Sequence, residues 1–331
     1  MSGGALDLAQ SRVYVAGHRG LAGSAIHRAL TAAGVTDVIT RTHDELDLTR
    51  PDGVRKLFQE TRPEVVFLCA ARVGGIAANN VYPADFIYSN LSIQTNVLES
   101  ARAAGVRRLV FMGSSCIYPR DCPQPILESY LLSGPLESTN RPYAVAKIAG
   151  VEMCWSYNRQ YGTEFVGLMP SNLYGPGDNY HPEDSHVLAA LIRKAHEAKR
   201  DQREAITVWG SGTPRREFVY SDDLAEAALT VASLTGDTLA ETFPQNLPPI
   251  INVGAGADIS ISELAELICE VIGFEGGLDW DTSRPDGTPR KFLDVSRIMR
   301  LGWAPRTALR EGIALAYRDF LDRGEGRSAT A

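Results

Sequence analysis

The sequence predicts an α/β protein built on a doubly wound parallel sheet, with a smaller, mostly C-terminal α/β lobe. Three observations lead to this prediction. Residues 13–16 read as a short apolar strand that passes through a glycine-rich turn into a helical pattern. Residues 65–71 form a continuous apolar run, which is typical of a parallel strand buried on both faces. Strand and helix patterns then alternate through the first half of the chain, as they do when helices cover both faces of a parallel sheet.

Composition limits the class of protein. The chain has 331 residues, enough for one large or two smaller domains, and its 44% hydrophobic and 22% charged content is typical of a soluble globular protein. The net charge of −7 gives no support for nucleic-acid binding by bulk attraction. No apolar run approaches the ~20 residues of a membrane-spanning helix, and the first ten residues lack the pattern of a signal peptide. We therefore expect a protein that binds neither nucleic acid nor membrane.

The cysteines are few, odd in number and without the paired spacing of a metal site. This favours free thiols in a reducing, cytoplasmic compartment and predicts no metal. Both ends of the chain, residues 1–10 and 324–331, are expected to fray. The cysteines are Cys69, Cys116, Cys122, Cys154 and Cys269.

The glycine turn that follows residues 13–16 has the spacing G-x-x-G-x-x-G. The commoner fingerprint is G-x-G-x-x-G, and glycines this close together can also make an ordinary loop. The strand before the turn and the helix after it favour a Rossmann-type dinucleotide site, in which the pyrophosphate lies at the helix N-terminus. The predicted cofactor contacts in this turn are Gly17, His18, Arg19, Gly20, Leu21, Ala22 and Gly23.

The residue after the second predicted strand, at 38–40, distinguishes NADP from NAD. NAD-binding folds usually place an acidic residue there for the ribose 2′-hydroxyl, whereas this chain has Arg41. A cation suits a 2′-phosphate, and Arg19 is a second candidate ligand. Two solvated arginines are the alternative, and the acidic Asp44 and Glu45 close by weaken the case. We predict NADP(H) as the cofactor.

Further strand and helix units follow in the first half. We expect strands at 109–112 and 166–169 and helices at 85–103 and 143–161. Ligands of such sheets bind outside the carboxyl ends of the strands. Near strand ends, the further predicted cofactor contacts are Asp47 and Leu48, which border the adenine, and Pro170, Asn172 and Leu173.

The second half of the chain has a different character. Glycine and proline break it into loops, and helix patterns cover 186–199 and 262–272. A cofactor lobe followed by a more variable lobe suggests that the second one holds the substrate. The predicted division is an NADP-binding domain at 11–178 and a substrate domain at 179–323, with about 215–240 returning to the first domain.

Three side chains suit the reduction of a carbonyl group. Tyr143 and Lys147 are four residues apart, so on a helix they share one face. A phenol has a pKa of about 10, and a nearby ammonium favours the phenolate. Ser114 can hydrogen-bond the same substrate oxygen. Together they can deliver a proton to a carbonyl oxygen while hydride reaches its carbon, a reaction that does not need the nearby Cys116.

The chain resembles the extended short-chain dehydrogenase/reductases that act on nucleotide sugars. The glycine turn, Ser114, the pair Tyr143 and Lys147, and residues 218–223 carry this resemblance. Within the family, the chain is most similar to enzymes that both epimerise and reduce a GDP-linked 4-keto sugar. The Tyr-x-x-x-Lys spacing is common to many oxidoreductases, whereas other segments are more specific. The matching segments are 16–20, 73–76, 79–80, 83–87, 113–119, 142–150, 156–162, 172–176, 185–187, 209–214 and 285–291.

The resemblance implies conversion of GDP-4-keto-6-deoxy-D-mannose to GDP-L-fucose, by 3,5-epimerisation and then NADPH-dependent reduction of the C4 ketone. It implies that Cys116 is the base and His186 the acid of the epimerisation. Lys147 would lower the pKa of Tyr143 and hold the nicotinamide ribose. The family forms homodimers, and the two long predicted helices carry enough apolar surface for one. The residues implied to bind the GDP-sugar are His186, Lys194, Trp209, Arg216 and Asp286.

Each of these assignments has a simpler alternative. Cys116 could be a small core hydrophobe, and His186 could cap the helix that follows it. Trp209 could belong to the core, and Pro-Asp-Gly at Asp286 is an ordinary turn signal. Cys122 reads as a bystander, although a disulfide with Cys116 would inactivate the site.

Three residues depart from the family pattern. Ala16 stands where the wider superfamily has Thr, although this branch also has Ala. His43 stands where Arg is frequent, which leaves one cation fewer for a 2′-phosphate. Lys194 stands where Arg is common, which gives a point charge in place of a bidentate fork.

Two other functions are compatible with much of the sequence. One is a related nucleotide-sugar epimerase or dehydratase that acts on a 4-hydroxyl substrate and favours NAD. Arg41 and Cys116 fit the epimerase-reductase better. The other is a non-catalytic NADP-binding sensor of redox state, a class in which the tyrosine or lysine is often lost, whereas Tyr143 and Lys147 are both present.

Overall fold

The larger sheet has six parallel strands, in a computed structural model that describes residues 6–182 and 184–324. The strand order β2-β1-β3-β4-β5-β9 runs outward from β1 in both directions, so the sheet is doubly wound. The predicted α/β fold class is therefore confirmed. The strands are β1 (Val13–Ala16), β2 (Val38–Ile39), β3 (Val65–Leu68), β4 (Arg108–Met112), β5 (Phe165–Pro170) and β9 (Ile250–Val253).

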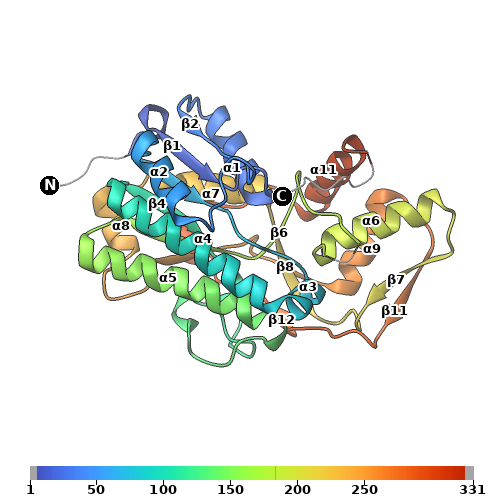
Figure 1. Cartoon of the computed structure of the whole chain (residues 1–331). Coiled ribbons are helices and arrows are strands. Elements are labelled where there is room, and N and C mark those ends of the chain that lie inside the picture. The colour runs from blue at the N-terminus through green and yellow to red at the C-terminus, as the bar shows by residue number, and fades with distance from the viewer. Residues whose placement is uncertain (1–5, 183, 325–331) are drawn as a thin grey trace.

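Helices flank this sheet (Figure 1). One pair, α1 and α7, packs together, and α4 contacts both α2 and α5. Both α4 and α5 end at a glycine, Gly105 (φ 73°) and Gly162 (φ 67°), because glycine adopts the left-handed conformation without a steric penalty. The helices of this lobe are α1 (Leu21–Ala32), α2 (Pro51–Thr61), α3 (Ile76–Val81), α4 (Pro83–Ala104), α5 (Arg141–Tyr161), α7 (Ser221–Ala232), α8 (Gly236–Thr242) and α10 (Ser296–Met299).

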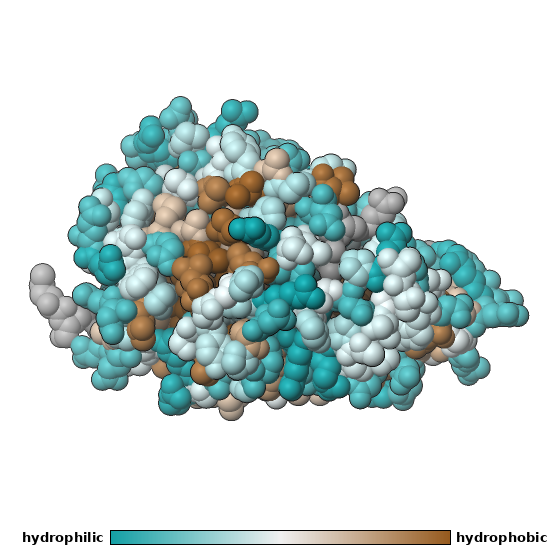
Figure 2. Space-filling view, turned by 90° about the horizontal axis from the view of Figure 1, so that it is seen from below, coloured by the Kyte–Doolittle hydropathy of each residue, from teal (hydrophilic) through white to brown (hydrophobic). Residues whose placement is uncertain are grey.

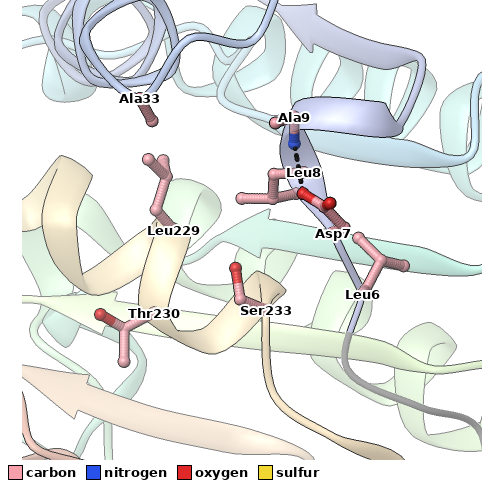
Figure 3. Close-up of a pocket in the computed structure, with 8 residues that line it drawn as sticks. All are labelled: Leu6, Asp7, Leu8, Ala9, Ala33, Leu229, Thr230 and Ser233. Carbon is pink, nitrogen blue, oxygen red and sulfur yellow. Dashed lines mark hydrogen bonds between the residues drawn. The ribbon is translucent and has the colours of Figure 1, made fainter.

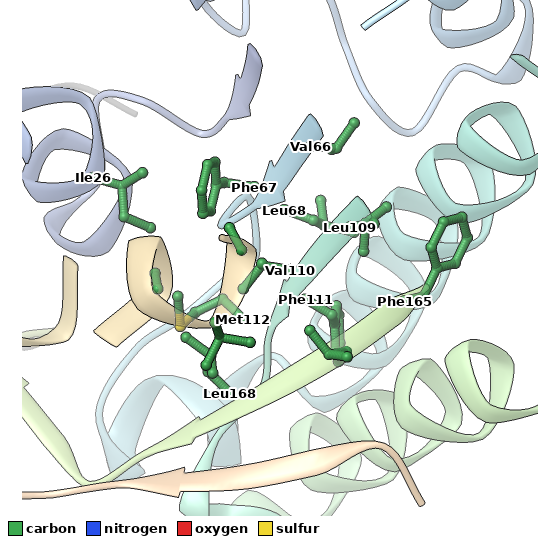
Figure 4. Close-up of a cluster of buried hydrophobic side chains, with 14 of the residues drawn as sticks. Ile26, Val66, Phe67, Leu68, Leu109, Val110, Phe111, Met112, Phe165 and Leu168 are labelled. Atoms are coloured by element: carbon green, nitrogen blue, oxygen red, sulfur yellow. The ribbon is translucent and has the colours of Figure 1, made fainter. Parts of the chain in front are cut away.

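The core of the larger lobe is made by strands that are buried along their whole length. Every residue of β1, β3, β4 and β5 is buried. Figure 4 shows Phe67 and Phe111 from neighbouring strands, with Phe165 of β5 and Ile26 of α1 in the same cluster. Burial on both faces explains why these strands read as unbroken apolar runs in the sequence.

The N-terminal segment is better ordered than the sequence suggests. Leu6 and Leu8 are buried in the core of the larger lobe, so the prediction that all of the first ten residues fray is wrong. Burying a leucine side chain contributes about 1.5–3 kcal/mol relative to exposure, which anchors this segment. The outer parts of both predicted frayed ends, residues 1–5 and 325–331, lie outside the described residues.

The second half of the chain has more strands than predicted. In a small sheet the order is β10-β8-β12, with β6 also pairing β8, and β7 pairs β11. Most of these strands are short and their partners are distant along the chain, so no local alternation marks them in the sequence. The elements are β6 (Asn172–Tyr174), β7 (Ala205–Trp209), β8 (Arg215–Tyr220), β10 (Asp258–Ser260), β11 (Gly277–Asp281), β12 (Arg290–Lys291), α6 (Val187–Arg200), α9 (Ile261–Ile272) and α11 (Leu309–Asp322).

The chain crosses between the two lobes where β8 passes into α7. Strand β8 belongs to the small sheet, whereas α7 follows it directly, packs on α1 and adds Leu224 and Val231 to the larger core. A second core includes buried residues of α6, α9 and α11. Among the described residues, no helix combines the length and the apolar character needed to cross a membrane.

Candidate active site

The predicted site residues lie around the carboxyl ends of the parallel strands. The glycine turn follows β1, and the Ser114 turn follows β4. Helix α5 brings Tyr143 and Lys147 against the Ser114 turn, and β12 reaches the same place from the smaller lobe. This is the edge at which open α/β sheets bind their ligands.

The glycine turn is shaped so that only glycine fits at two of its positions. Gly17 has a φ of 84°, and a Cβ there would lie 2.7 Å from the backbone of Ala70. A Cβ on Gly23 would lie 2.1 Å from the carbonyl oxygen of Gly17. No side chain caps the N-terminus of α1 at Gly20. The turn therefore presents a close backbone and uncapped amides to an anion, as a pyrophosphate site requires.

His18 adds a second indication of a ligand in this turn. Its Nδ1 atom is buried and has no hydrogen-bond partner among the described residues. Partial burial lowers the pKa of His18 below its usual value, and the charge of Arg19 lowers it further. An unpartnered polar atom beside uncapped helix amides fits a bound phosphate group.

The predicted ligands of the 2′-phosphate lie near one carboxylate. Glu45 accepts a hydrogen bond from the backbone N–H of Thr42 at 2.7 Å, which is the main reason that its pKa is lowered. The charges of Arg41 and Arg19 lower the pKa of Glu45 further, so both arginines lie close to it. Both arginine residues are exposed, Arg19 in the glycine turn after β1 and Arg41 after β2. Arg19 and Arg41 thus both act electrostatically on Glu45, which is a partial counter-charge to them.

The residues predicted to border the adenine are held in a turn of their own. The Asp47 carboxylate accepts hydrogen bonds from the backbone N–H (2.9 Å) and hydroxyl (2.7 Å) of Thr49, and these lower its pKa. Leu48 is buried, and its carbonyl accepts a hydrogen bond from Asn96 at 2.9 Å. The backbone here is therefore firmly placed.

The predicted contacts after β5 bridge the two lobes. Pro170 ends β5 and pairs with Val253 of β9. Asn172 and Leu173 lie on β6, which pairs with β8 of the smaller sheet. The side chain of Asn172 donates a hydrogen bond to the carbonyl of Glu217 at 3.1 Å. These residues are positioned where the larger sheet meets the smaller one.

Lys147 is almost completely buried beside the end of β4. Its side chain is on a residue only 3% exposed, and its Nζ atom donates a hydrogen bond to the carbonyl of Met112 at 2.7 Å. Burial lowers the pKa of Lys147 to about 8. Its Nζ atom lies 5.7 Å from the centre of the Tyr143 ring. The predicted lysine–tyrosine pair is therefore assembled on one face of α5.

Tyr143 interacts with Ser114 and lies near Lys147 and Cys116. Surrounding protein desolvates its phenol and raises its pKa above the usual value, and Cys116 raises it further. A hydrogen bond with the Ser114 side chain opposes this rise. The structure thus brings Ser114, Tyr143, Lys147 and Cys116 into one cluster.

The Cys116 thiol has polar surroundings. It lies on a short 3-10 turn in which the Ser114 hydroxyl accepts a hydrogen bond from the Cys116 backbone N–H at 3.2 Å. Its Sγ atom is 3.1 Å from Nδ2 of Asn140 and 3.6 Å from Nζ of Lys291. A cysteine that serves only as a core hydrophobe would have apolar neighbours instead.

His186 stands at the first position before α6, where it makes no side-chain cap. Its ring is open to solvent but crowded by protein atoms, which lower its pKa. The charge of Lys291 lowers this pKa further. Lys291 therefore acts electrostatically on His186 and has its Nζ atom 3.6 Å from Cys116 Sγ.

Asn140 and Lys291 are site residues that the sequence does not single out. Lys291 belongs to the matching segment 285–291, but only the pairing of β12 with β8 brings it to Cys116. Asn140 immediately precedes α5, close to Tyr143 in sequence, and its amide points at the thiol. The proximity of Asn140 to the tyrosine motif is the one local signal that could have identified it.

Trp209 is an exposed aromatic residue at the end of β7. It is 44% exposed, so it is not a core residue. The Lys194 Nζ atom lies 5.1 Å from its ring centre, and the guanidinium carbon of Arg284 lies 4.8 Å from it. Burial, followed by the charges of Arg193 and Arg284, lowers the pKa of Lys194. Cations around an accessible indole suit a base attached to phosphates.

Asp286 holds the loop that leads into β12 in place through hydrogen bonds. Its carboxylate accepts hydrogen bonds from the backbone N–H (2.7 Å) and hydroxyl (2.8 Å) of Ser211. Arg216 donates a hydrogen bond to the Asp286 carbonyl at 3.2 Å. Burial lowers the pKa of Arg216, whereas neighbouring Cys116 and Asp286 raise it. Arg216 thus holds this loop and interacts electrostatically with Cys116.

A shallow hollow of about 400 Å³ lies far from this cluster (Figure 3). It is formed by residues that precede β1, the end of α1 and the end of α7, at the amino ends of the strands, and therefore at the edge opposite the candidate site. The residues that line the hollow are Leu6, Asp7, Leu8, Ala9, Ala33, Leu229, Thr230 and Ser233.

Among the described residues, no group of three or more His, Cys, Asp or Glu side chains could hold a metal ion.

The glycine turn and the pair of Tyr143 and Lys147 together define an extended short-chain dehydrogenase/reductase site. Residues 13–254 match the NAD dependent epimerase/dehydratase family, and the chain belongs to that family.

Individual relatives indicate which members of this family the chain is similar to. The chain is 53% identical to a probable GDP-L-fucose synthase 1 of Oryza sativa subsp. japonica, over 94% of this chain and 92% of that protein. It is 50% identical to the GDP-L-fucose synthase of Escherichia coli (strain K12), over 95% of this chain and 98% of that protein. A solved GDP-L-fucose synthetase from Naegleria fowleri bound to NADP is 27% identical, with a TM-score of 0.86, and covers 98% of this chain and 96% of its own. These comparisons confirm the family resemblance seen in the sequence.

Proposed function

We propose that this chain is a GDP-L-fucose synthase, which epimerises GDP-4-keto-6-deoxy-D-mannose at C3 and C5 and then reduces C4 with NADPH. The observation that carries the proposal is the cluster in which the Cys116 thiol adjoins the Ser114, Tyr143 and Lys147 group. A reductase alone does not need the thiol. Relatives that are half identical and matched over nearly their whole length support the same reaction.

The epimerisation uses the acidity of hydrogens that flank a ketone. Removing the proton from C3 or C5 gives an enolate whose charge lies on O4, where Ser114 and Tyr143 donate hydrogen bonds. Cys116 accepts the proton as a thiolate on one face of the ring. His186, in its protonated form, returns a proton to the carbon from the other face. Proton exchange with solvent then removes the proton from Cys116 and restores the one on His186 before the second carbon reacts. Each carbon is thereby inverted with no net loss of protons.

The reduction follows at the same oxygen. NADPH, when bound, supplies the hydride that reaches C4. Tyr143 donates its proton to O4, and the Lys147 ammonium stabilises the tyrosinate that remains. Lys147 also holds the nicotinamide ribose.

NADP(H) is the cofactor, and the glycine turn has the shape and uncapped amides that suit its pyrophosphate. Arg19 and Arg41 hold the 2′-phosphate. The other proposed contacts are Gly17, His18, Gly20, Leu21, Ala22, Gly23, Asp47, Leu48, Pro170, Asn172 and Leu173.

The GDP group lies on the smaller lobe. The Trp209 ring stacks on the guanine, and Lys194 and Arg216 pair with the phosphates. His186 faces the sugar. Asp286 contributes by holding the Ser211 turn and the start of β12 in place, since its carboxylate is already hydrogen-bonded to Ser211.

The proposed division is a cofactor domain at 11–178 and a substrate domain at 179–323, with about 215–240 returning to the first. The larger core also includes residues of β9 and α10, whereas β8 belongs to the small sheet. The protein works in the cytoplasm as a homodimer that pairs α4 and α5. Hydrophobic residues gather over the larger lobe (Figure 2), and exposed ones on these helices include Tyr88, Val145 and Tyr161. All five cysteines are free, which suits a reducing compartment.

The test is incubation with NADPH and GDP-4-keto-6-deoxy-D-mannose in deuterated water. We expect NADPH oxidation, deuterium at C3 and C5, and the GDP-L-fucose stereochemistry. Well-folded protein that oxidises no NADPH would overturn the proposal. Turnover of a 4-hydroxyl substrate with no net use of cofactor would instead indicate a related epimerase. Sedimentation as a monomer would exclude the dimer.

A further inference from the structure

Glu217 is a completely buried carboxylate next to the site. It lies on β8 between Arg216 and Phe218 and is 0% exposed. Its carboxylate accepts hydrogen bonds from the backbone amides of Leu293 at 3.0 Å, Gly256 at 2.8 Å, and Ala255. Burial raises its pKa to about 7 in spite of these donors. Burying a carboxylate is costly unless it is well hydrogen-bonded, so this group has an exacting position.

The three amides belong to two separate segments of the chain. Ala255 and Gly256 follow β9, the edge strand of the larger sheet, whereas Leu293 follows β12. A Cβ on Gly254 would lie 2.3 Å from the Glu217 carboxylate, so the first segment is shaped to receive it. Glu217 therefore joins β8, the end of β9 and the segment after β12 at one point.

This junction fixes the approach of Lys291 to the thiol. Strand β12 pairs with β8 only as far as Lys291, which lies opposite Arg216. Two residues later the Leu293 amide bonds to the Glu217 side chain instead of to the β8 backbone. Glu217 thus holds the segment that follows Lys291, together with Gln124, which accepts a hydrogen bond from the Phe292 amide at 2.9 Å. The Lys291 Nζ atom lies 3.6 Å from Cys116 Sγ.

We infer that Glu217 is a positioning residue for the epimerisation half of the reaction. It sets the distance of Lys291 from Cys116 and His186, and it ties that distance to the edge of the cofactor sheet. This inference rests on the proposed function. The Ser114, Tyr143 and Lys147 group has its own support from the Met112 carbonyl and the α5 backbone, and does not depend on Glu217.

The test compares two fates of one bound intermediate in Glu217→Gln. The side-chain amide keeps the size of the carboxylate but puts an N–H donor against the backbone donors. We expect the fraction of product reduced without inversion at C3 and C5 to rise at least fivefold over the wild type. This fraction is measured by product stereochemistry. It is insensitive to the amount of folded enzyme, so general destabilisation does not change it.

A second variant tests whether Glu217 acts through the lysine. Lys291→Met should shift the product fraction in the same direction, and the double variant should shift it no further than Lys291→Met alone. Additive effects would show independent roles and overturn the inference. If Glu217→Gln does not fold, Glu217→Asp keeps the charge and shortens its reach, and the same shift is expected.

The matched control is Asp178→Asn. Asp178 is also buried, accepts a backbone hydrogen bond from Asn179 at 2.7 Å, and has a pKa raised to about 7, but lies outside the Cys116 cluster. Its variant should give the wild-type product fraction. An unchanged fraction in Glu217→Gln, with an active wild type, overturns the inference alone. A wild type that makes no inverted product overturns the proposed function together with it.

Discussion

The two lysines of the candidate site stand in opposite situations. Lys147 is 3% exposed and is held by the Met112 carbonyl, one turn along α5 from Tyr143. Lys291 is half-buried on a two-residue strand from the other lobe, with its Nζ atom 3.6 Å from Cys116 Sγ. The group around Tyr143 and Lys147, proposed for the reduction half, is therefore built within the larger lobe. The group around Cys116, proposed for the epimerisation half, needs residues from both lobes.

This difference has a chemical meaning under the proposed function. Proton delivery to O4 needs a fixed donor, which one helix and one turn can supply. Proton exchange at two carbons needs a base and an acid on opposite faces of the sugar, so it needs groups from separate elements. Cys116 follows β4, whereas His186 precedes α6. Variants that affect one half-reaction more than the other therefore test this difference between the two parts of the site directly.

The largest effect is expected from Tyr143→Phe. Removing the hydroxyl removes the proton donor for O4, and a positioned general acid is worth about 10²–10⁴ in rate. NADPH oxidation should fall by that factor, as measured by cofactor absorbance. Deuterium uptake at C3 and C5, followed by mass spectrometry, should fall less, because Ser114 still donates to the enolate oxygen.

The control is Tyr157→Phe on the same helix. The Tyr157 hydroxyl donates a hydrogen bond to Glu99 at 2.9 Å, away from the cluster. This variant should keep the wild-type rate. If Tyr143→Phe retained full NADPH oxidation, the assignment of the proton donor would be wrong.

The next effect is expected from Cys116→Ser. A serine hydroxyl is a far weaker base than a thiolate, so deuterium uptake at C3 and C5 should fall by about 10² or more. NADPH affinity should stay within twofold, because the cysteine lies outside the glycine turn. Cys122→Ser, which changes a half-buried thiol nearby, should have the wild-type uptake. Undiminished uptake in Cys116→Ser would exclude the thiol as the base.

The reduction half is also the part that the sequence predicts best. Gly17 to Gly23 and Tyr143 with Lys147 are local patterns, since each lies within one turn or one helix. The buried strands β3 and β4 can be recognised in the sequence as apolar runs. These features predict the fold class, the edge of the sheet at which the site lies, and the glycine turn proposed to bind the cofactor.

The epimerisation half is largely invisible to such patterns. Lys291 becomes a neighbour of Cys116 through the pairing of β12 with β8, across a separation of 175 residues. Only the family resemblance proposed Cys116 and His186, and it said nothing of Asn140 or Glu217. These contacts depend on the pairing of short strands that are far apart in the sequence, and such pairing leaves no local periodicity.

A smaller effect concerns the pH dependence of reduction. Burial lowers the pKa of Lys147 to about 8, so its ammonium is lost as the pH rises through that value. The proposed mechanism needs the charged form. The single-turnover rate of NADPH oxidation should therefore be level below about pH 7, be halved near pH 8, and approach a tenfold fall per pH unit above about pH 9. A rate that stays level to pH 9.5 would show that the lysine charge is not required.

The smallest effect concerns the choice of cofactor. Glu45 lies near Arg19 and Arg41 and competes with a 2′-phosphate for their charge. Glu45→Gln should therefore lower the KM for NADPH about two- to fivefold at low salt and leave that for NADH unchanged, because exposed charges interact weakly and are screened. Glu60→Gln, which removes the exposed partner of Lys56 on α2, is the control and should change neither KM. A higher KM for both cofactors would mean instead that Glu45 binds a ribose hydroxyl, as the acidic residue does in NAD-binding folds.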